Sequence, residues 1–134
     1  FKEVNDTHGH PVGDKYLIHV AGRIAAAIRE SDMAARFGGE EFVVLAPNAS
    51  LAEAVSLAER IRESVGSSPL RLDQIVVDNT ISIGVAEYDP EPQFGSNILE
   101  DMIEKADKAL YRAKQSGRNR VESWPFPNGP ERCP

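Results

Sequence analysis

Two carboxylates directly after a pair of glycines are the strongest candidates for chemistry in the sequence. The segment Arg36–Phe42 reads RFGGEEF. Because glycine has no Cβ, the backbone at Gly38 and Gly39 can turn tightly and approach a bulky ligand. The two glutamates are then expected on opposite faces of the outgoing strand, where at least one can meet a divalent cation or a substrate hydroxyl. A plain Gly-Gly hairpin with solvated acids explains the same residues and is the alternative.

A second polar segment, residues 1–14, reads FKEVNDTHGHPVGD and is expected to form a loop just before a helix. An Asn amide and an Asp carboxylate together match the donor and acceptor pattern of a guanine edge. The competing interpretation is that these side chains simply form turns and helix caps. His8 and His10 are separated by one glycine, and such loop histidines are more often structural or solvated than metal ligands.

Three helices are expected from the spacing of apolar residues. They cover residues 17–28, 51–65 and 99–113. Ser50 and Glu53 form a capping box at the start of the second helix, and Asn97 and Glu100 stand at capping spacing before the third. The apolar stripe of the third helix comprises Leu99, Met102, Ile103, Ala106, Leu110 and Ala113.

Strands are expected between the helices. They cover residues 33–37, 41–46, 70–77 (a short hairpin), 80–88 and 121–124. The alternation predicts an α/β arrangement with helices packed on a sheet, although no strand precedes the first helix. Residues 1–124 are expected to form one domain, and residues 125–134, with four prolines, a C-terminal tail.

Composition excludes several classes of protein. Twenty-one acidic residues against fifteen Lys and Arg, a net charge of −6, argue against a general nucleic-acid binder. The one cysteine, Cys133, allows neither a disulfide framework nor a cysteine-based zinc site. No run of about 18 apolar residues is present. The chain opens on Phe1 without a signal peptide, so a piece of a longer protein is expected.

The two polar segments and two later ones resemble the GGDEF domain of bacterial diguanylate cyclases, here in its GGEEF form. Four segments match in the family's order and spacing between Phe1 and about Val121: FKEVNDTHGHPVGD, RFGGEEF, ISIGVA and ADKALYRAKQSGRNRV. The resemblance implies an α+β fold with a central, mostly antiparallel sheet of about five strands flanked by helices. This is a nucleotide-cyclase-like, ferredoxin-type core, whose first strand is expected to be absent from this chain.

The resemblance also implies an activity. Diguanylate cyclases condense two GTP molecules into cyclic di-GMP and release pyrophosphate, using two divalent cations, Mg²⁺ or Mn²⁺, at each GTP site. Each domain holds one GTP, so a second GGDEF domain must face the first in a homodimer. The implied setting is cytoplasmic signal transduction. An upstream sensor domain is expected in the parent protein, together with any membrane anchor through a region outside these residues.

Site residues carry over by their position in the motifs. Glu40 is expected to bind metal and to act as base for the 3′-hydroxyl, with Glu41 assisting and also binding metal. Lys2 is placed with these catalytic residues, since it would neutralise phosphate charge. The residues expected to bind substrate are Asn5 and Asp14 for guanine and Gly38, Gly39, Lys114 and Arg118 for the phosphates. For Lys114 and Arg118, the alternative is ordinary helix C-terminal charges that complement the dipole.

An R-x-x-D sequence, Arg29 to Asp32, precedes the two glycines. In the family this is the position of the product-inhibition site, where the Arg and Asp hold a cyclic di-GMP dimer. Arg60 stands where a neighbouring domain's arginine would complete that site. An Arg guanidinium can stack on guanine and also bind phosphate with two hydrogen bonds. A four-letter pattern also occurs by chance, which is the alternative here.

One departure from the family pattern bears on activity. In the family, a short apolar strand ending in Asp-x-Asp precedes Phe1-Lys2, and its first aspartate binds both metals. Because hard cations need several oxygen ligands, this chain alone is expected to be inactive or nearly so. The alternative function is a catalytically idle module that senses GTP or cyclic di-GMP through Arg29 and Asp32. The intact Gly38–Phe42 segment favours the enzyme over that module and over a purely structural domain.

Overall fold

The computed structural model describes residues 2–126, which form two compact units. Within that range the first unit contains residues 2–48 and 63–79, and the second contains residues 49–62 and 80–126. Helix α3 (Leu51–Gly66) contributes residues to both units. No helix in this part of the chain is both long and apolar enough to cross a membrane.

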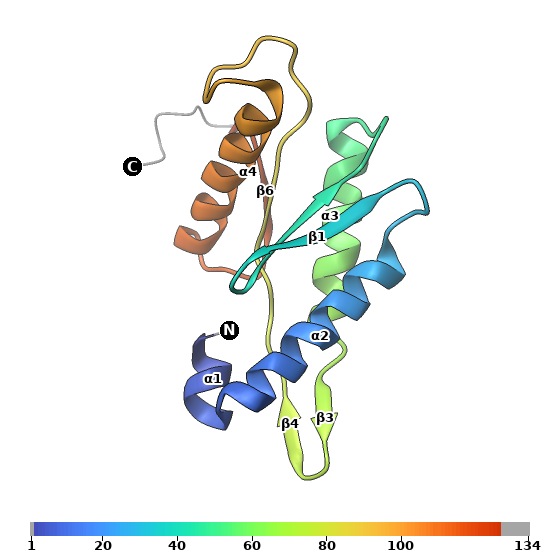
Figure 1. Cartoon of the computed structure of the whole chain (residues 1–134), viewed down its shortest axis with the longest axis vertical. Helices are drawn as coiled ribbons and strands as arrows, with labels where there is room; N and C mark the ends of the chain where they lie inside the picture. The colour runs from blue at the N-terminus through green and yellow to red at the C-terminus, as the bar shows by residue number, and fades with distance from the viewer. Residues whose placement is uncertain (1, 127–134) are drawn as a thin grey trace. The chain divides into compact units, whose positions relative to one another are not determined.

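The first unit begins with two helices that pack on each other, α1 (Lys2–His8) and α2 (His10–Ala27) (Figure 1). Gly9 separates them with a φ of 88°, and Pro11 occupies the first turn of α2, where its missing N–H is not needed. The prediction of a loop over residues 1–14 is therefore wrong. The packing of α1 on α2 leaves Val4 only 6% exposed, which outweighs the turn preference of Asn, Asp and Gly.

An antiparallel hairpin follows, formed by β1 (Met33–Gly38) and β2 (Glu41–Leu45). Arg36 pairs with Phe42 but Gly38 pairs with Glu41, so Phe37 is an extra residue in β1 and forms a β-bulge. The two-residue turn is consequently Gly39–Glu40 and not the expected Gly38–Gly39. The bulge moves the turn one residue along the chain.

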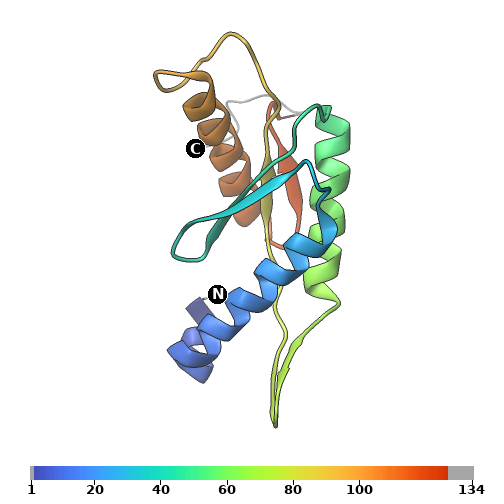
Figure 2. The ribbon, with the colours of Figure 1, turned by 45° about the vertical axis from the view of Figure 1, so that its right-hand side comes forward.

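The remaining part of the first unit is a second, short hairpin. Strands β3 (Leu70–Leu72) and β4 (Ile75–Val77) pair antiparallel, as expected for residues 70–77, and form the narrow ribbon in Figure 2. Arg23 of α2 donates from its Nε to Ser64 Oγ at 2.7 Å and ties α2 to the end of α3 that belongs to this unit.

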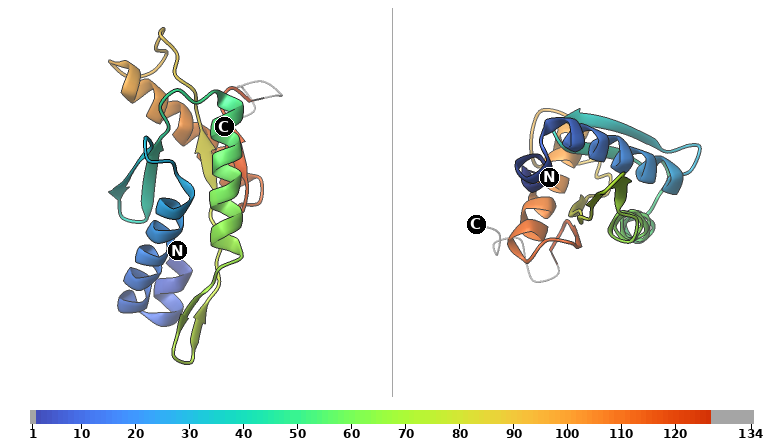
Figure 3. Two further views of the ribbon diagram at one scale, coloured as in Figure 1. Left: turned by 90° about the vertical axis from the view of Figure 1, so that its right-hand side faces the viewer. Right: turned by 90° about the horizontal axis from the view of Figure 1, so that it is seen from below.

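The second unit is built on a strand–helix–strand element. Strands β5 (Ile83–Val85) and β6 (Val121–Ser123) are parallel, and α4 (Ile98–Gln115) connects them and packs on both (Figure 3). A parallel pair requires such a crossover. The expected strand over residues 80–88 is shorter than predicted, because its partner β6 offers only three residues for pairing.

Helix α4 buries a wider face than the expected one. Its buried residues are Asp101, Lys105, Ala109 and Ala113, whereas Leu99 is 52% exposed. Asp101 Oδ2 lies 2.8 Å from Lys105 Nζ, so the two buried charges form an ion pair. The predicted stripe holds for Ala113, which is buried, and for Met102, Ile103, Ala106 and Leu110, which are half-buried. It leaves out Asp101 and Lys105, because apolar spacing does not reveal a charged pair that compensates itself in the core.

The end of the second unit packs through aromatic rings. The backbone N–H of Trp124 donates to Val85 O at 2.9 Å. The Trp124 ring contacts the rings of Phe94 and Phe126 edge to face. Phe126, which the proline content had assigned to the tail, is 4% exposed, and the Arg112 guanidinium lies over its ring. Residues 127–134, including Cys133, lie outside the described residues.

The α+β class is confirmed, while the pairing of strands differs in detail from one sheet of about five. Among residues 2–126 the structure pairs six strands as three two-stranded sheets. Two of these are hairpins closed by local turns, which sequence patterns report well. Whether strands far apart in the sequence pair into one larger sheet depends on long-range contacts, which the alternation of apolar and polar residues does not encode.

Candidate functional site

The tip of the β1–β2 hairpin presents the two candidate carboxylates. Glu40 lies in the turn and Glu41 is the first residue of β2, so the expectation that both follow on the strand is wrong for Glu40. Both side chains are exposed, and neither makes an ion pair or side-chain hydrogen bond among residues 2–126. A Cβ at Gly38 or Gly39 would meet no atom of residues 2–126 within 4 Å, so this part of the chain leaves the backbone of the turn open to a ligand.

Arg36 braces this turn, a role that the sequence patterns did not reveal. Its Nε donates to Gly39 O at 2.8 Å, and Nη2 donates to the same oxygen. Gly39 has a φ of 47°, in the left-handed region. The guanidinium therefore fixes the carbonyl between the two turn residues, Gly39 and Glu40. Its place three residues before Gly39 was the available signal.

The candidate guanine-binding residues lie on the two N-terminal helices. Asn5 is half-buried on α1, and its side-chain oxygen Oδ1 is buried without a hydrogen-bond partner among the described residues. Asp14 is exposed in α2. No hydrogen bond joins the two within the described part of the chain. Lys2 lies in α1, and its side chain lies outside the described residues.

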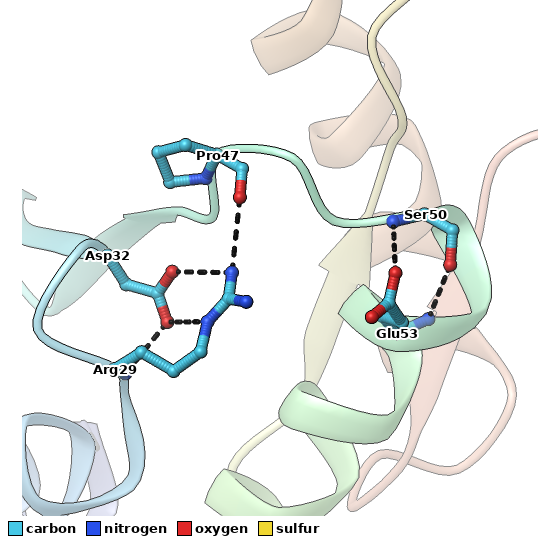
Figure 4. Close-up of polar contacts among 5 residues, drawn as sticks. All are labelled: Arg29, Asp32, Pro47, Ser50 and Glu53. Carbon is cyan, nitrogen blue, oxygen red and sulfur yellow. Dashed lines mark hydrogen bonds and ion pairs between the residues drawn. The ribbon is translucent and has the colours of Figure 1, made fainter.

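In the R-x-x-D segment, the side chains of Arg29 and Asp32 contact each other (Figure 4). Arg29 Nη2 lies 3.0 Å from Asp32 Oδ1, and Arg29 Nε and backbone N both donate to Oδ2. A further bond runs from Arg29 Nη2 to Pro47 O at 3.1 Å. The Asp32 side chain is fully buried, while that of Arg29 is 51% exposed. The carboxylate thus holds the guanidinium in place and leaves about half of the arginine accessible.

In the second unit, the candidate phosphate-binding residues lie at the end of α4. Lys114 is in its last turn and Arg118 follows Gly117, and both side chains are exposed. The Arg118 N–H donates to Ala113 O at 3.0 Å, which closes the helix. Arg60 is exposed on α3. Figure 4 also shows the capping box of α3, where Ser50 and Glu53 exchange hydrogen bonds as predicted.

The protein ligands for a metal are few. Within residues 2–126 no group of three or more His, Cys, Asp or Glu side chains could hold a metal ion. Glu40 and Glu41 are nonetheless two neighbouring, unpaired oxygen donors. Mg²⁺ is usually held by one or two carboxylates together with substrate phosphates and water, so the donor set fits a cation that arrives with a nucleotide.

Comparison with known proteins identifies the family of this chain. The family described as "Diguanylate cyclase, GGDEF domain" matches residues 1–120. The chain belongs to the GGDEF domain family. The four motif segments therefore belong to a diguanylate cyclase domain, and the α+β nucleotide-cyclase-like fold is confirmed.

Relatives of this GGDEF domain are numerous. Diguanylate cyclase A of Treponema denticola is 47% identical over 121 residues, which cover 90% of this chain and 32% of that protein. The structure of diguanylate cyclase SiaD with its activator SiaC, from Pseudomonas aeruginosa, superposes with a TM-score of 0.81 at 37% identity and covers 91% of this chain and 45% of that one. The GGDEF domain of DgcB from Caulobacter crescentus, in complex with c-di-GMP, gives 0.81 at 34% identity, with 91% and 70% coverage. The chain spans about a third or less of the curated relatives it matches.

A buried ion pair organises the second unit of this GGDEF domain. Burial raises the pKa of Asp101, but the hydrogen bonds from Lys105 and from the N–H groups of Phe94 and Gln93 outweigh it and hold the pKa below its ordinary value. The bond to Asp101 raises the pKa of Lys105, against the effect of its burial. Asp101 therefore pins the 93–94 segment to α4, and this role is structural.

Proposed function

We propose that this GGDEF domain catalyses the condensation of two GTP molecules into cyclic di-GMP and pyrophosphate. The observation that carries the proposal is the hairpin tip, where Glu40 and Glu41 are exposed and unpaired on a braced turn with an open backbone. The family to which the chain belongs supports the reaction. Phosphoryl transfer needs mainly positioning and charge stabilisation; this tip would position the reacting groups, and a divalent cation held by its carboxylates would stabilise the phosphate charge.

The reaction is an exchange at phosphorus. The 3′-hydroxyl oxygen of one GTP attacks the α-phosphorus of the other, its proton passes to a carboxylate, and pyrophosphate leaves. A second such exchange closes the ring. Glu40, in the turn, is the proposed base, and Glu41 assists it. A divalent cation held by these two residues and the phosphates would neutralise the charge that develops on the phosphate oxygens.

The remaining candidate residues bind the nucleotide. The buried Oδ1 of Asn5 is an acceptor without a donor in the part of the chain that the structure describes, and an unsatisfied acceptor of this kind is costly unless a ligand completes it. Guanine offers N–H donors of this type, and Asp14 would accept from the same edge. Lys2, Lys114 and Arg118 would neutralise phosphate charge. Because one domain holds one GTP, we propose a second copy of the domain as the partner in catalysis.

Product inhibition is proposed for the Arg29–Asp32 pair. The buried Asp32 carboxylate orients the guanidinium of Arg29, whose side chain is half exposed, so that it can meet a guanine ring or a phosphate. Arg60 of a neighbouring copy would complete this site. The complex of the DgcB GGDEF domain with c-di-GMP shows that a relative of this chain binds the nucleotide.

The test measures binding and turnover separately. Calorimetry with Mg²⁺ is expected to show that the chain binds GTP. The Asn5→Ala variant should bind GTP about tenfold more weakly, because it loses one neutral hydrogen bond to a buried acceptor. Glu91→Gln, at an exposed loop residue, is the matched control for Glu40→Gln, which is expected to weaken the Mg²⁺-dependent part of binding. Absence of GTP binding would refute the proposal.

Turnover is measured as cyclic di-GMP by chromatography. Little product is expected from the chain alone, and joining the family's Asp-x-Asp strand ahead of Phe1 is expected to raise it by about a hundredfold or more, since it supplies the further metal ligand. Glu40→Gln in the extended chain should abolish that gain. GTP binding without turnover in the extended chain would instead support the idle sensing module.

A further inference from the structure

The loop after α4 holds its backbone in an unusual conformation, while the Arg118 side chain makes no ion pair or side-chain hydrogen bond among residues 2–126. Gly117, Arg118 and Asn119 have φ values of 118°, 63° and 47°, so three consecutive residues are left-handed. Two of them carry side chains, for which this region is unfavourable, and Arg has none of the tolerance of Asn. Such a run persists only where surrounding contacts determine it.

Asn119 is held from two sides. Its side-chain Oδ1 accepts a hydrogen bond from Arg62 Nη1 of α3 at 2.9 Å, and its backbone N–H donates to Ser82 Oγ at 3.2 Å. Arg62 is itself oriented by Glu59, whose Oε2 lies 2.9 Å from Nη2. These contacts lie within the second unit and join the loop to a helix and to the residue before β5.

Arg118 and Lys114 are arranged differently. Both side chains are exposed, and neither makes an ion pair or side-chain hydrogen bond within the described residues. The backbone of Arg118 is nevertheless fixed by its N–H bond to Ala113 O and by the locked residue that follows. A fixed backbone with a free guanidinium suits an anion that arrives from solution, because less order is lost on binding.

We propose that Arg62 and Ser82, acting through Asn119, are positioning residues that fix where the Arg118 guanidinium meets the polyphosphate of the nucleotide. The inference rests on the proposed function for the identity of the anion. It gives roles to three residues, Arg62, Ser82 and Asn119, that do not touch the substrate.

The first variants leave the charge of the 134-residue chain unchanged, so that loss of a positive charge does not confuse their effect on binding. Asn119→Ala is expected to weaken GTP binding about tenfold by calorimetry, and Ser82→Ala severalfold, because Arg118 is less well placed. Guanosine, which lacks phosphate, should bind to the wild type and to both variants with the same affinity. Asn48→Ala is the matched control, since Asn48 is also an exposed left-handed asparagine (φ 61°) and its variant should bind GTP as the wild type does.

A double-mutant cycle separates positioning from a general loss of structure. In an Arg118→Ala background, Asn119→Ala should cause no further loss of GTP affinity, because it acts through Arg118. Arg62→Lys keeps one donor for Asn119 and should retain more affinity than Arg62→Met. Additive losses in the cycle, or equal losses for guanosine and GTP, would overturn the proposal.

Inorganic tripolyphosphate distinguishes failure of this inference from failure of the proposed function. If the chain binds tripolyphosphate in an Asn119-dependent way but does not bind GTP, the positioning role stands and the nucleotide assignment fails. If Asn119→Ala leaves the affinity for both ligands unchanged, or if neither ligand binds the wild type, the positioning role is refuted.

Discussion

Replacing Gly84 by alanine should strongly destabilise the second unit. A Cβ on Gly84 would lie 2.0 Å from Ala106 O, 2.4 Å from Leu110 N and 2.9 Å from Leu110 Cα. Ordinary van der Waals contact begins at 3.4 Å, so β5 and α4 must separate by about 1.4 Å at this point. All three atoms belong to the helix backbone, which cannot move aside as a side chain does.

The expected cost is about 3 kcal/mol or more in the free energy of unfolding, the upper end of the range for overpacked cores. Urea titration followed by far-ultraviolet circular dichroism measures it by linear extrapolation. Gly22→Ala is the matched control, because Gly22 is an exposed α2 residue whose Cβ would meet nothing within 4 Å. That change should stabilise the protein by about 0.5–1 kcal/mol. A Gly84→Ala variant within about 1 kcal/mol of the wild type would refute the argument from close packing.

Single side chains carry the remaining predictions. Burial, aided by the charge of Asp78, raises the pKa of Tyr16 to about 12. The folded state therefore keeps the Tyr16 proton to a higher pH than the unfolded chain does. The contribution of Tyr16 to the free energy of unfolding is complete below about pH 10 and is lost as the pH rises from about 10 to 12. In urea titrations over this range, the Tyr16→Phe variant should lose less stability than the wild type. Arg36→Ala should lower stability by less than about 1 kcal/mol but raise severalfold the Mg²⁺ concentration needed for half-maximal GTP binding, because the hairpin turn loses its brace; an unchanged Mg²⁺ dependence would argue against that role. Arg29→Ala should weaken cyclic di-GMP binding by about tenfold or more in calorimetry, whereas the neighbouring Glu30→Ala should not, and equal effects of the two would count against the inhibitory site.

The sequence predicts local signals well. The capping box at Ser50 forms as expected, and Asn97 caps α4 by accepting from the Glu100 N–H at 2.9 Å. Glu100, however, reaches back to Ser96 rather than to Asn97. Caps are predictable because donor and acceptor lie within one turn of each other.

Features that depend on tertiary contacts were missed. The bulge at Phe37 shifts the hairpin turn by one residue, and nothing in the RFGGEEF letters marks it. Helix α1 forms on a sequence rich in turn-favouring residues because its packing on α2 buries Val4. The loop-holding roles of Arg62 and Asn119 join residues 57 positions apart, which no spacing rule connects.

The motifs locate the candidate site residues along the chain, whereas the geometry around each of them depends on the fold. Motif positions placed Glu40 and Glu41 at the hairpin tip, but the order of turn and strand depended on the bulge. For Arg29 and Asp32, the letters gave a pair at turn spacing, while the burial of the carboxylate came only from the fold. The environment of a side chain is set by elements that are distant in the sequence, so it is the feature of a site that the sequence predicts least well.

The aromatic packing around Trp124 gives the molecule an internal optical probe. Trp124 is the chain's one tryptophan, and its ring contacts Phe94 and Phe126 within the second unit. Its fluorescence therefore follows the melting of that unit, while circular dichroism follows the helices of both. Coincident curves from the two signals would mean that the units unfold as one cooperative body, and separated curves would mean that each has a stability of its own.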